Sequence, residues 1–139
     1  TPKVSIPVND RFRAAAGVIY LNAPDLFGNK RTGGGIAFGV GTFGTPNSNV
    51  SAGLGWGFIQ GDFSANPVVT LSGMHRVSRK VALVTENWLI PSDGYYGIYS
   101  YGVRFFGEKL SVDLAFLNNP DISSLLLLGI PYLDFVVKF

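Results

Sequence analysis

The chain has 139 residues and a formal net charge of +2, with 14% charged residues and 47% hydrophobic ones. Soluble domains usually carry about 25% charged residues, and a chain this short cannot bury so much apolar area within itself. The composition therefore argues against an ordinary soluble domain and favours contact with lipid. Positive charges are scattered rather than clustered, so no nucleic-acid partner is expected, and the lack of Cys excludes disulfides and thiol chemistry.

Apolar residues alternate with small or polar ones along most of the chain, and this period of two is typical of β-strands. In chain order, the pattern predicts nine strands, at Lys3–Val8, Phe12–Asn22, Thr32–Phe43, Asn49–Gln60, Pro67–Val77, Val81–Leu89, Tyr95–Phe106, Leu110–Leu117 and Ile130–Phe139. No stretch holds the roughly 20 successive apolar residues of a spanning helix, and a closed barrel is the other way to cross lipid. We therefore expect an all-β fold, an antiparallel transmembrane β-barrel of the outer-membrane type.

The predicted connections tend to alternate in length, as in outer-membrane barrels, whose periplasmic turns are short and whose extracellular loops are longer. Short turns are predicted at Asn9-Asp10, Gly44–Asn49, Ser78–Lys80 and Gly107–Lys109. Longer loops are predicted at Ala23–Arg31, Gly61–Asn66, Ile90–Gly94 and Asn118–Ser124. Bacterial single-chain barrels have an even number of strands. Residues 1–139 are therefore either the C-terminal portion of a larger barrel, or a single barrel domain of eight strands with Lys3–Val8 outside the wall.

One face of the predicted strands is too small and too polar to be a core, so we expect it to line a lumen, with the Leu/Val/Phe face against lipid. Small residues on that face are Gly35, Ala37, Gly39, Gly41, Ser51, Gly53, Gly55 and Gly57. Charged residues assigned to it are Arg13, Arg76, Glu86, Arg104, Asp113, Asp134 and Lys138. We interpret them as an internal network of ion pairs, because desolvated charges need partners. A solute-selecting pore lining and a catalytic pair of carboxylates are the alternatives.

Three other motifs have simpler structural explanations. His75 is the only histidine, and Ser72 lies on the opposite face of the same strand, so the two cannot pair as neighbours there. The glycine-rich stretch "GGGIAFGVG" (Gly33–Gly41) lacks the Lys-Ser/Thr ending of a phosphate loop. "LLLL" (Leu125–Leu128) is expected to extend the final strand, or else to dock a partner protein. We therefore predict no catalytic, cofactor-binding or metal-binding residues.

The C-terminal segment "YLDFVVKF" resembles the terminal signal of outer-membrane barrels, which ends in an aromatic residue preceded by alternating apolar ones. Here those residues are Leu133, Phe135, Val137 and Phe139, and the resemblance implies recognition by the barrel assembly machinery. More broadly, "VSAGLGWGF", "LSGMHRVSRKVALVTENW" and "YGVRFFGEKLSVDLAF" are similar to a group of uncharacterised outer-membrane proteins of the Bacteroidota. That resemblance implies a barrel in the bacterial outer membrane and no particular activity.

We therefore expect an outer-membrane β-barrel protein with a structural or pore-forming, porin-like role, and with the lipid bilayer as its main partner. The first alternative is a barrel subunit of a larger outer-membrane protein complex, favoured by the odd strand count and by "LLLL". An outer-membrane enzyme has the least support, so we expect no enzyme and no cofactor.

Overall fold

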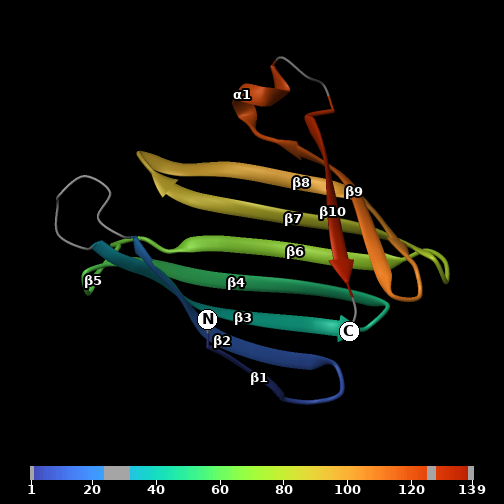
Figure 1. Cartoon of the computed structure of the whole chain (residues 1–139), viewed down its shortest axis with the longest axis horizontal. Coiled ribbons are helices and arrows are strands. Elements are labelled where there is room, and N and C mark those ends of the chain that lie inside the picture. Colours follow the sequence, from blue (N-terminus) through green and yellow to red (C-terminus); the bar gives the residue numbers. More distant parts are fainter. Residues whose placement is uncertain (1, 24–31, 125–127, 138–139) are drawn as a thin grey trace.

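The computed structural model describes residues 2–23, 32–124 and 128–137, and these form one antiparallel sheet (Figure 1). Its main strands are β1 (Lys3–Pro7), β2 (Phe12–Ala23), β3 (Thr32–Thr45), β4 (Ser48–Ile59), β6 (Val68–Arg76), β7 (Val81–Ser92), β8 (Gly94–Phe106), β9 (Leu110–Asn118) and β10 (Ile130–Val137). Each pairs with the next, and the two-residue strand β5 (Asp62–Phe63) pairs with β4 off this path. The predicted all-β antiparallel architecture is confirmed, with strand ends within three residues of those expected.

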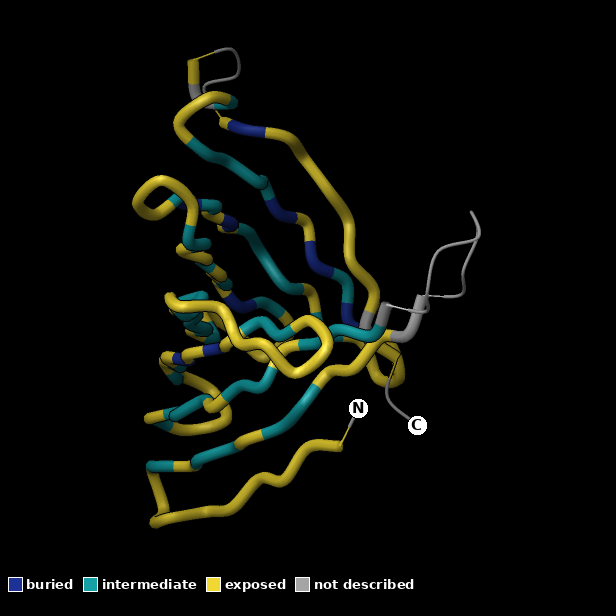
Figure 2. Tube along the Cα trace, turned by 90° about the vertical axis from the view of Figure 1, so that its left-hand side faces the viewer, coloured by how far each residue is buried: buried dark blue, intermediate teal, exposed yellow. Residues whose placement is uncertain are grey.

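The sheet is open within the described residues, with β1 and β10 as its two edges. Seen from the side in Figure 2, it is a curved wall whose edge strands bend toward the same side. Strand β1 pairs with β2 from Lys3 opposite Gly17 to Pro7 opposite Arg13, so the expectation that this segment lies outside the wall is wrong. Because nine strands follow one another antiparallel, β1 and β10 run in the same direction.

The connections are less regular than predicted. Strands β3 and β4 are joined by Pro46 and Asn47 alone, and β7 and β8 by Asp93 alone. The predicted loop at Ile90–Gly94 is therefore wrong, since the hairpin ladder continues to Ser92 opposite Gly94. Gly94 makes this tight turn with a φ of +124°, in the region that favours glycine. The turn-type residues of this segment mark the tip of a hairpin rather than a long loop.

A short helix lies within the predicted loop between β9 and β10. Helix α1 (Pro120–Ser123) begins after Asn119, whose side-chain oxygen accepts a hydrogen bond of 2.7 Å from the backbone N–H of Ile122. No helix among the described residues is long and apolar enough to span a membrane. Of "LLLL", only Leu128 is described. It precedes β10, so at this position the motif does not extend the final strand.

The cross-strand register decides which side chains share a face, because directly paired residues point to the same side of the sheet. One row of paired residues runs from Arg13 through Thr42, Ser51, Ser72 and Glu86 to Ser100. A second row joins Arg104, Asp113 and Asp134. We call the face that carries these two rows the charged face, and the opposite face the apolar face.

The predicted facing of strand β3 is wrong. Ala37 pairs with Trp56 and Gly39 with Leu54, so the small residues Gly35, Ala37, Gly39 and Gly41 lie on the apolar face. Both faces of β3 are apolar or small, so alternation alone does not fix which face is which, and the two-residue turn before β4 sets it. The glycines there leave room for rings from neighbouring strands. A Cβ on Gly35 would lie 2.7 Å from the Phe58 ring.

The described residues form no conventional hydrophobic core. Among the residues that the structure describes, Ala82 and Ala115 are the only buried apolar residues apart from glycines, and no large side chain is fully buried. Large apolar side chains instead remain exposed on the apolar face, including Leu71 at 52%, Leu83 at 52% and Leu133 at 59%. Figure 2 shows the same pattern, with buried positions sparse along a wall that is mostly exposed or half-buried. Covering such an apolar face is favourable because it removes apolar surface from water.

Candidate functional site

The charged face brings together side chains from strands far apart in the sequence. The register places six of the seven predicted charged residues on it, namely Arg13, Arg76, Glu86, Arg104, Asp113 and Asp134. Lys138 lies outside the described residues. Lys3, which the sequence analysis left out, shares this face because it pairs with Gly17 on β2. Every Asp, Glu, Lys and Arg in the nine main strands, as far as they are described, therefore lies on one side of the sheet.

Arg104 and Asp113 form a two-pronged ion pair on the charged face. The Arg104 Nε and Nη2 atoms each donate to one carboxylate oxygen of Asp113, both at 2.7 Å. The two side chains are 30% and 10% exposed, so the pair is largely withdrawn from water. Asp134 lies directly opposite Asp113 on β10 and accepts a hydrogen bond from the backbone N–H of Phe135. This fork geometry fixes the positions of β8 and β9 on the charged face.

Two of the other predicted charges, Glu86 and Arg76, have uncharged partners. Glu86 accepts a hydrogen bond of 3.0 Å from the indole N–H of Trp88. The Arg76 guanidinium lies 4.0 Å from the centroid of the Phe106 ring and donates to the Asn47 side chain at 3.3 Å. Among the described residues, the expected network thus contains one ion pair.

The curvature of the sheet makes the charged face concave. The Tyr132 hydroxyl on β10 reaches the Ser100 hydroxyl on β8 at 2.6 Å, across the intervening strand β9. Arg76 on β6 reaches Phe106 on β8 in the same way, across β7. Side chains two strands apart are brought closer together on the inside of a curved sheet, as Figure 2 shows for this one. A cavity of about 270 Å³ on this face is bordered by Glu86, Arg104, Asp113 and Tyr132.

A second hollow on the charged face is apolar, and the sequence analysis missed it. Two buried glycines of β4, Gly53 and Gly55, form its floor, because they carry no side chain to fill the space. Its walls are mainly aliphatic and aromatic side chains of β2, β3, β6 and β7, and Ser51, Ser72 and Glu86 also border it. We call this cavity of about 310 Å³ the glycine groove; its other lining residues are Ile19, Ile36, Phe38, Gly39, Val40, Leu54, Val68, Thr70 and Trp88.

In the part of the chain that the structure describes, the single histidine forms a side-chain hydrogen bond with a serine of the neighbouring strand. His75 lies on the apolar face, and its Nδ1 atom is 3.1 Å from the Ser48 hydroxyl on the neighbouring strand. Ser72 is on the opposite face, as the alternation predicts. The Ser48 pairing could not be found from spacing along one strand, because it depends on the register between β4 and β6. No group of three metal-ligating side chains occurs among the described residues.

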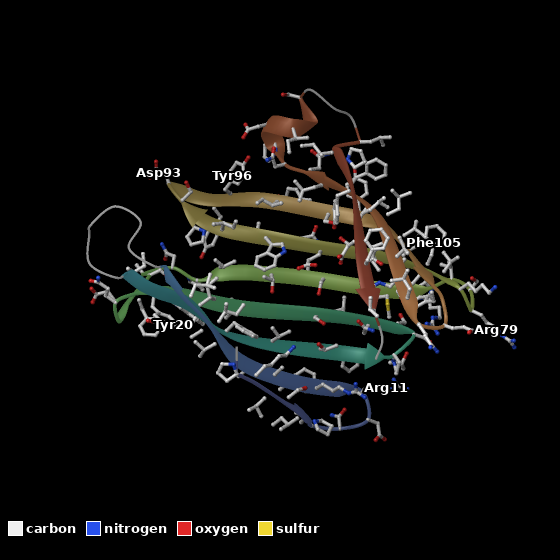
Figure 3. All side chains as sticks on the ribbon, in the orientation of Figure 1. Arg11, Tyr20, Arg79, Asp93, Tyr96 and Phe105 are labelled. Atoms are coloured by element: carbon white, nitrogen blue, oxygen red, sulfur yellow. The ribbon has the colours of Figure 1, made fainter. Side chains whose placement is uncertain are left out.

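The charged residues labelled in Figure 3 lie at opposite ends of the strands. Arg11 and Arg79 lie at the end that carries the β3–β4 turn, and Asp93 and Tyr96 lie at the other end. The Tyr96 hydroxyl donates a hydrogen bond of 2.7 Å to Asp121 in helix α1. On β10, the predicted assembly-signal residues Leu133, Phe135 and Val137 lie on the apolar face, paired with Leu114, Val112 and Leu110. Phe139 lies outside the described residues.

Comparison with known proteins gives no match to a family, to a curated protein or to a solved structure.

Proposed function

We propose that this sheet is part of the wall of a transmembrane β-barrel in a bacterial outer membrane, with a structural or pore-forming role. The observation that carries the proposal is the division of the sheet into two faces. Within the described strands, the apolar face presents exposed Leu, Val, Phe and Trp side chains and no Asp, Glu, Lys or Arg. A lipid-facing surface has this composition, while charged side chains are tolerated on the lumen side.

Polar residues on the apolar face support the proposal because they have partners within the sheet. The Asn87 side chain donates to the backbone carbonyl of Leu71 at 3.0 Å and to the Thr85 hydroxyl at 3.1 Å. Thr85 in turn donates to the carbonyl of Ser100 at 2.8 Å. No water is present in hydrocarbon to satisfy such groups, so internal partners are what a lipid-facing polar residue needs.

Strand length agrees with a membrane crossing. Strands β2, β4 and β7 have 12 residues each, and β8 has 13. A tilted strand needs about 9–11 residues to cross the hydrocarbon core. Lipid is the partner that covers the apolar face in this proposal, and the barrel assembly machinery is the partner that inserts the chain.

Labelling of single cysteines tests which face meets water, and the natural lack of Cys makes each substitution the only thiol. Leu83→Cys places a thiol on the apolar face, and Asn49→Cys places one on the charged face. In membrane vesicles opened to both sides, we expect a charged thiol reagent to modify the Asn49 variant and to leave the Leu83 variant unmodified. As a control, both variants should react fully with the reagent once they are unfolded. Equal rates for the two folded variants would contradict the proposal.

A second candidate function is that of a barrel subunit in a larger outer-membrane assembly, and the two open edges favour it. An edge strand carries unpaired backbone N–H and C=O groups, which are very costly in lipid. Strands β1 and β10 run in the same direction, so antiparallel closure requires an odd number of further strands. Partner chains that supply such strands satisfy both edges.

Disulfide trapping distinguishes a self-closed sheet from one completed by other strands. A double variant, Ser5→Cys with Asp134→Cys, places thiols on β1 and β10 on the same face. If other strands complete the wall, we expect no disulfide within the chain after oxidation in native membranes. A rapid intramolecular disulfide would show that the edges meet directly and would sink this second candidate. A Ser51→Cys and Ser72→Cys pair, already opposite each other on β4 and β6, is the positive control.

A further inference from the structure

The glycine groove changes from polar to apolar along its length. Ser51, Ser72 and Glu86 occupy one row of paired residues at one end. The following rows bring in Val40 and Trp88, then Phe38 and Val68, and finally Ile36. From Ser51 to Gly55, the groove follows four residues of β4, which is about 13 Å at the rise of a strand. A long narrow hollow with one polar end matches the shape of a single-chain amphiphile.

The size and lining of the groove suit a ligand better than bulk water. Its volume of about 310 Å³ lies at the lower end of the range of small-molecule sites, about 300–1,000 Å³. Ile36 is 36% exposed and Trp88 39% exposed, so the concave face leaves large apolar groups uncovered. Contiguous exposed apolar surface that is rimmed by polar residues typically marks a binding site.

The occupant that fits is a hydrocarbon chain rather than a peptide. The strands that form the floor and walls, β3, β4 and β6, are hydrogen-bonded to one another along the groove. They therefore offer no free backbone groups to an inserted polypeptide, whose own N–H and C=O groups would remain unpaired over an apolar floor. A hydrocarbon chain has no such groups to satisfy.

Charge at the polar end selects the head group. Among the described residues that border the groove, Glu86 is the one with a charged side chain, and one of its oxygens already accepts a hydrogen bond from Trp88. A head group that donates hydrogen bonds and carries a positive charge complements the other oxygen and the hydroxyls of Ser51 and Ser72. We propose that the glycine groove binds a single-chain amphiphile with a cationic, amine-type head group at Glu86 and its tail along Phe38 and Ile36. This inference goes beyond a structural or pore-forming role and does not depend on what covers the apolar face.

The two tryptophans allow direct observation of binding, because one lies in the groove and the other on the opposite face. In a Trp56→Phe variant, Trp88 is the only tryptophan, and a brominated dodecylamine quenches its fluorescence when the tail enters the groove. The full chain is kept soluble by an amphipathic polymer, so that no free detergent competes. We expect saturable quenching that unbrominated dodecylamine reverses. Quenching that rises without saturation, as for simple partitioning, would overturn the proposal.

Matched glycine variants test the location of the site. Gly55→Val fills the groove, since a Cβ there meets Ile36 Cγ2 at 3.1 Å. Gly73→Val makes the same change on the adjacent strand β6 but points to the apolar face, where the nearest atom is 3.5 Å away and where the residue does not line the groove. We expect Gly55→Val to weaken the affinity for the probe about tenfold or more and Gly73→Val to leave it unchanged. Equal affinities in the two folded variants would contradict the location.

A head-group variant keeps the proposal falsifiable even if Gly55→Val does not fold. Glu86→Gln preserves shape and removes the negative charge. We expect it to weaken binding of brominated dodecylamine about threefold to fivefold and to leave binding of brominated dodecanol unchanged. A loss shared equally by the amine and the alcohol, or no loss for either, would refute the assignment of Glu86 as the head-group partner.

Discussion

Replacement of Asp113 by Ala is expected to lower the free energy of unfolding by about 3–5 kcal/mol. The substitution removes both acceptors of the Arg104 guanidinium, whose two hydrogen bonds to Asp113 are 2.7 Å long. Arg104 would then keep its charge in a site where it is only 30% exposed. Most of the loss comes from that stranded charge rather than from the intrinsic strength of the pair. Equilibrium unfolding in urea measures the difference from the natural sequence.

Two control variants make this prediction specific to the pair. Asp134→Ala removes the neighbouring exposed carboxylate, which forms no ion pair among the described residues, and should change stability by about 0.5 kcal/mol or less. The double variant Arg104→Met with Asp113→Leu removes both charges together and should recover most of the lost stability. If Asp113→Ala costs no more than Asp134→Ala, the pair does not stabilise the sheet.

The sequence predicts most of the strands because their alternation is strong. Leu110, Val112, Leu114 and Phe116 occupy every second position of β9, and Leu133, Phe135 and Val137 do the same on β10. Such a pattern fixes both the presence of a strand and which side chains share a face. The charged residues were assigned to one face for the same reason, and the register places all of those described on it.

Strand β3 and the tip of the β7–β8 hairpin show where that reasoning stops. In β3, Phe38 and Val40 alternate with Ala37 and Gly39, so both faces are apolar or small. The pattern therefore does not show which of the two faces is the charged face and which is the apolar face. In β7, Pro91 and Ser92 have the composition of a loop, yet they remain in the ladder because the turn is closed by Asp93 and Gly94. The face on which side chains lie and the length of the turn depend here on how the strands pair. The sequence of a single strand does not show that pairing.

The glycine groove was missed for a related reason. The alternation predicts Gly53 and Gly55 on the charged face, and the register places them there. The side chains that line the hollow over these two glycines come from the neighbouring strands. Because the facing of β3 was predicted wrongly, glycines were expected where Phe38 and Val40 actually lie. The predicted lumen was therefore uniformly small and polar, whereas the concave face has a charged part near β8 to β10 and an apolar part near β3 and β4.

Arginine at Leu71 should reveal the surroundings of the apolar face through its cost in stability. Leu71 lies near the middle of β6 and pairs with Ala52 and Asn87, which are themselves central in β4 and β7. In a bilayer this level of the sheet lies near the midplane, where arginine on the lipid face costs about 2–4 kcal/mol. Leu71 is 52% exposed in the sheet. If water rather than lipid covers this face, its replacement by arginine should change the free energy of unfolding by only about 0.5 kcal/mol.

Arginine at Ser72 supplies the matched control, because it puts the same charge one residue away on the opposite face. Ser72 pairs with Glu86, so an arginine there gains a carboxylate neighbour on the charged face. We expect the Ser72 variant to lose about 1 kcal/mol or less when the free energy of unfolding is measured from phospholipid bilayers. A large cost at Leu71 with a small cost at Ser72 matches lipid on one side and water on the other. Equal costs at both positions, or a small cost at both, would exclude lipid from the apolar face. Lipid on one face and water on the other is what makes arginine costly at Leu71 and tolerated at Ser72.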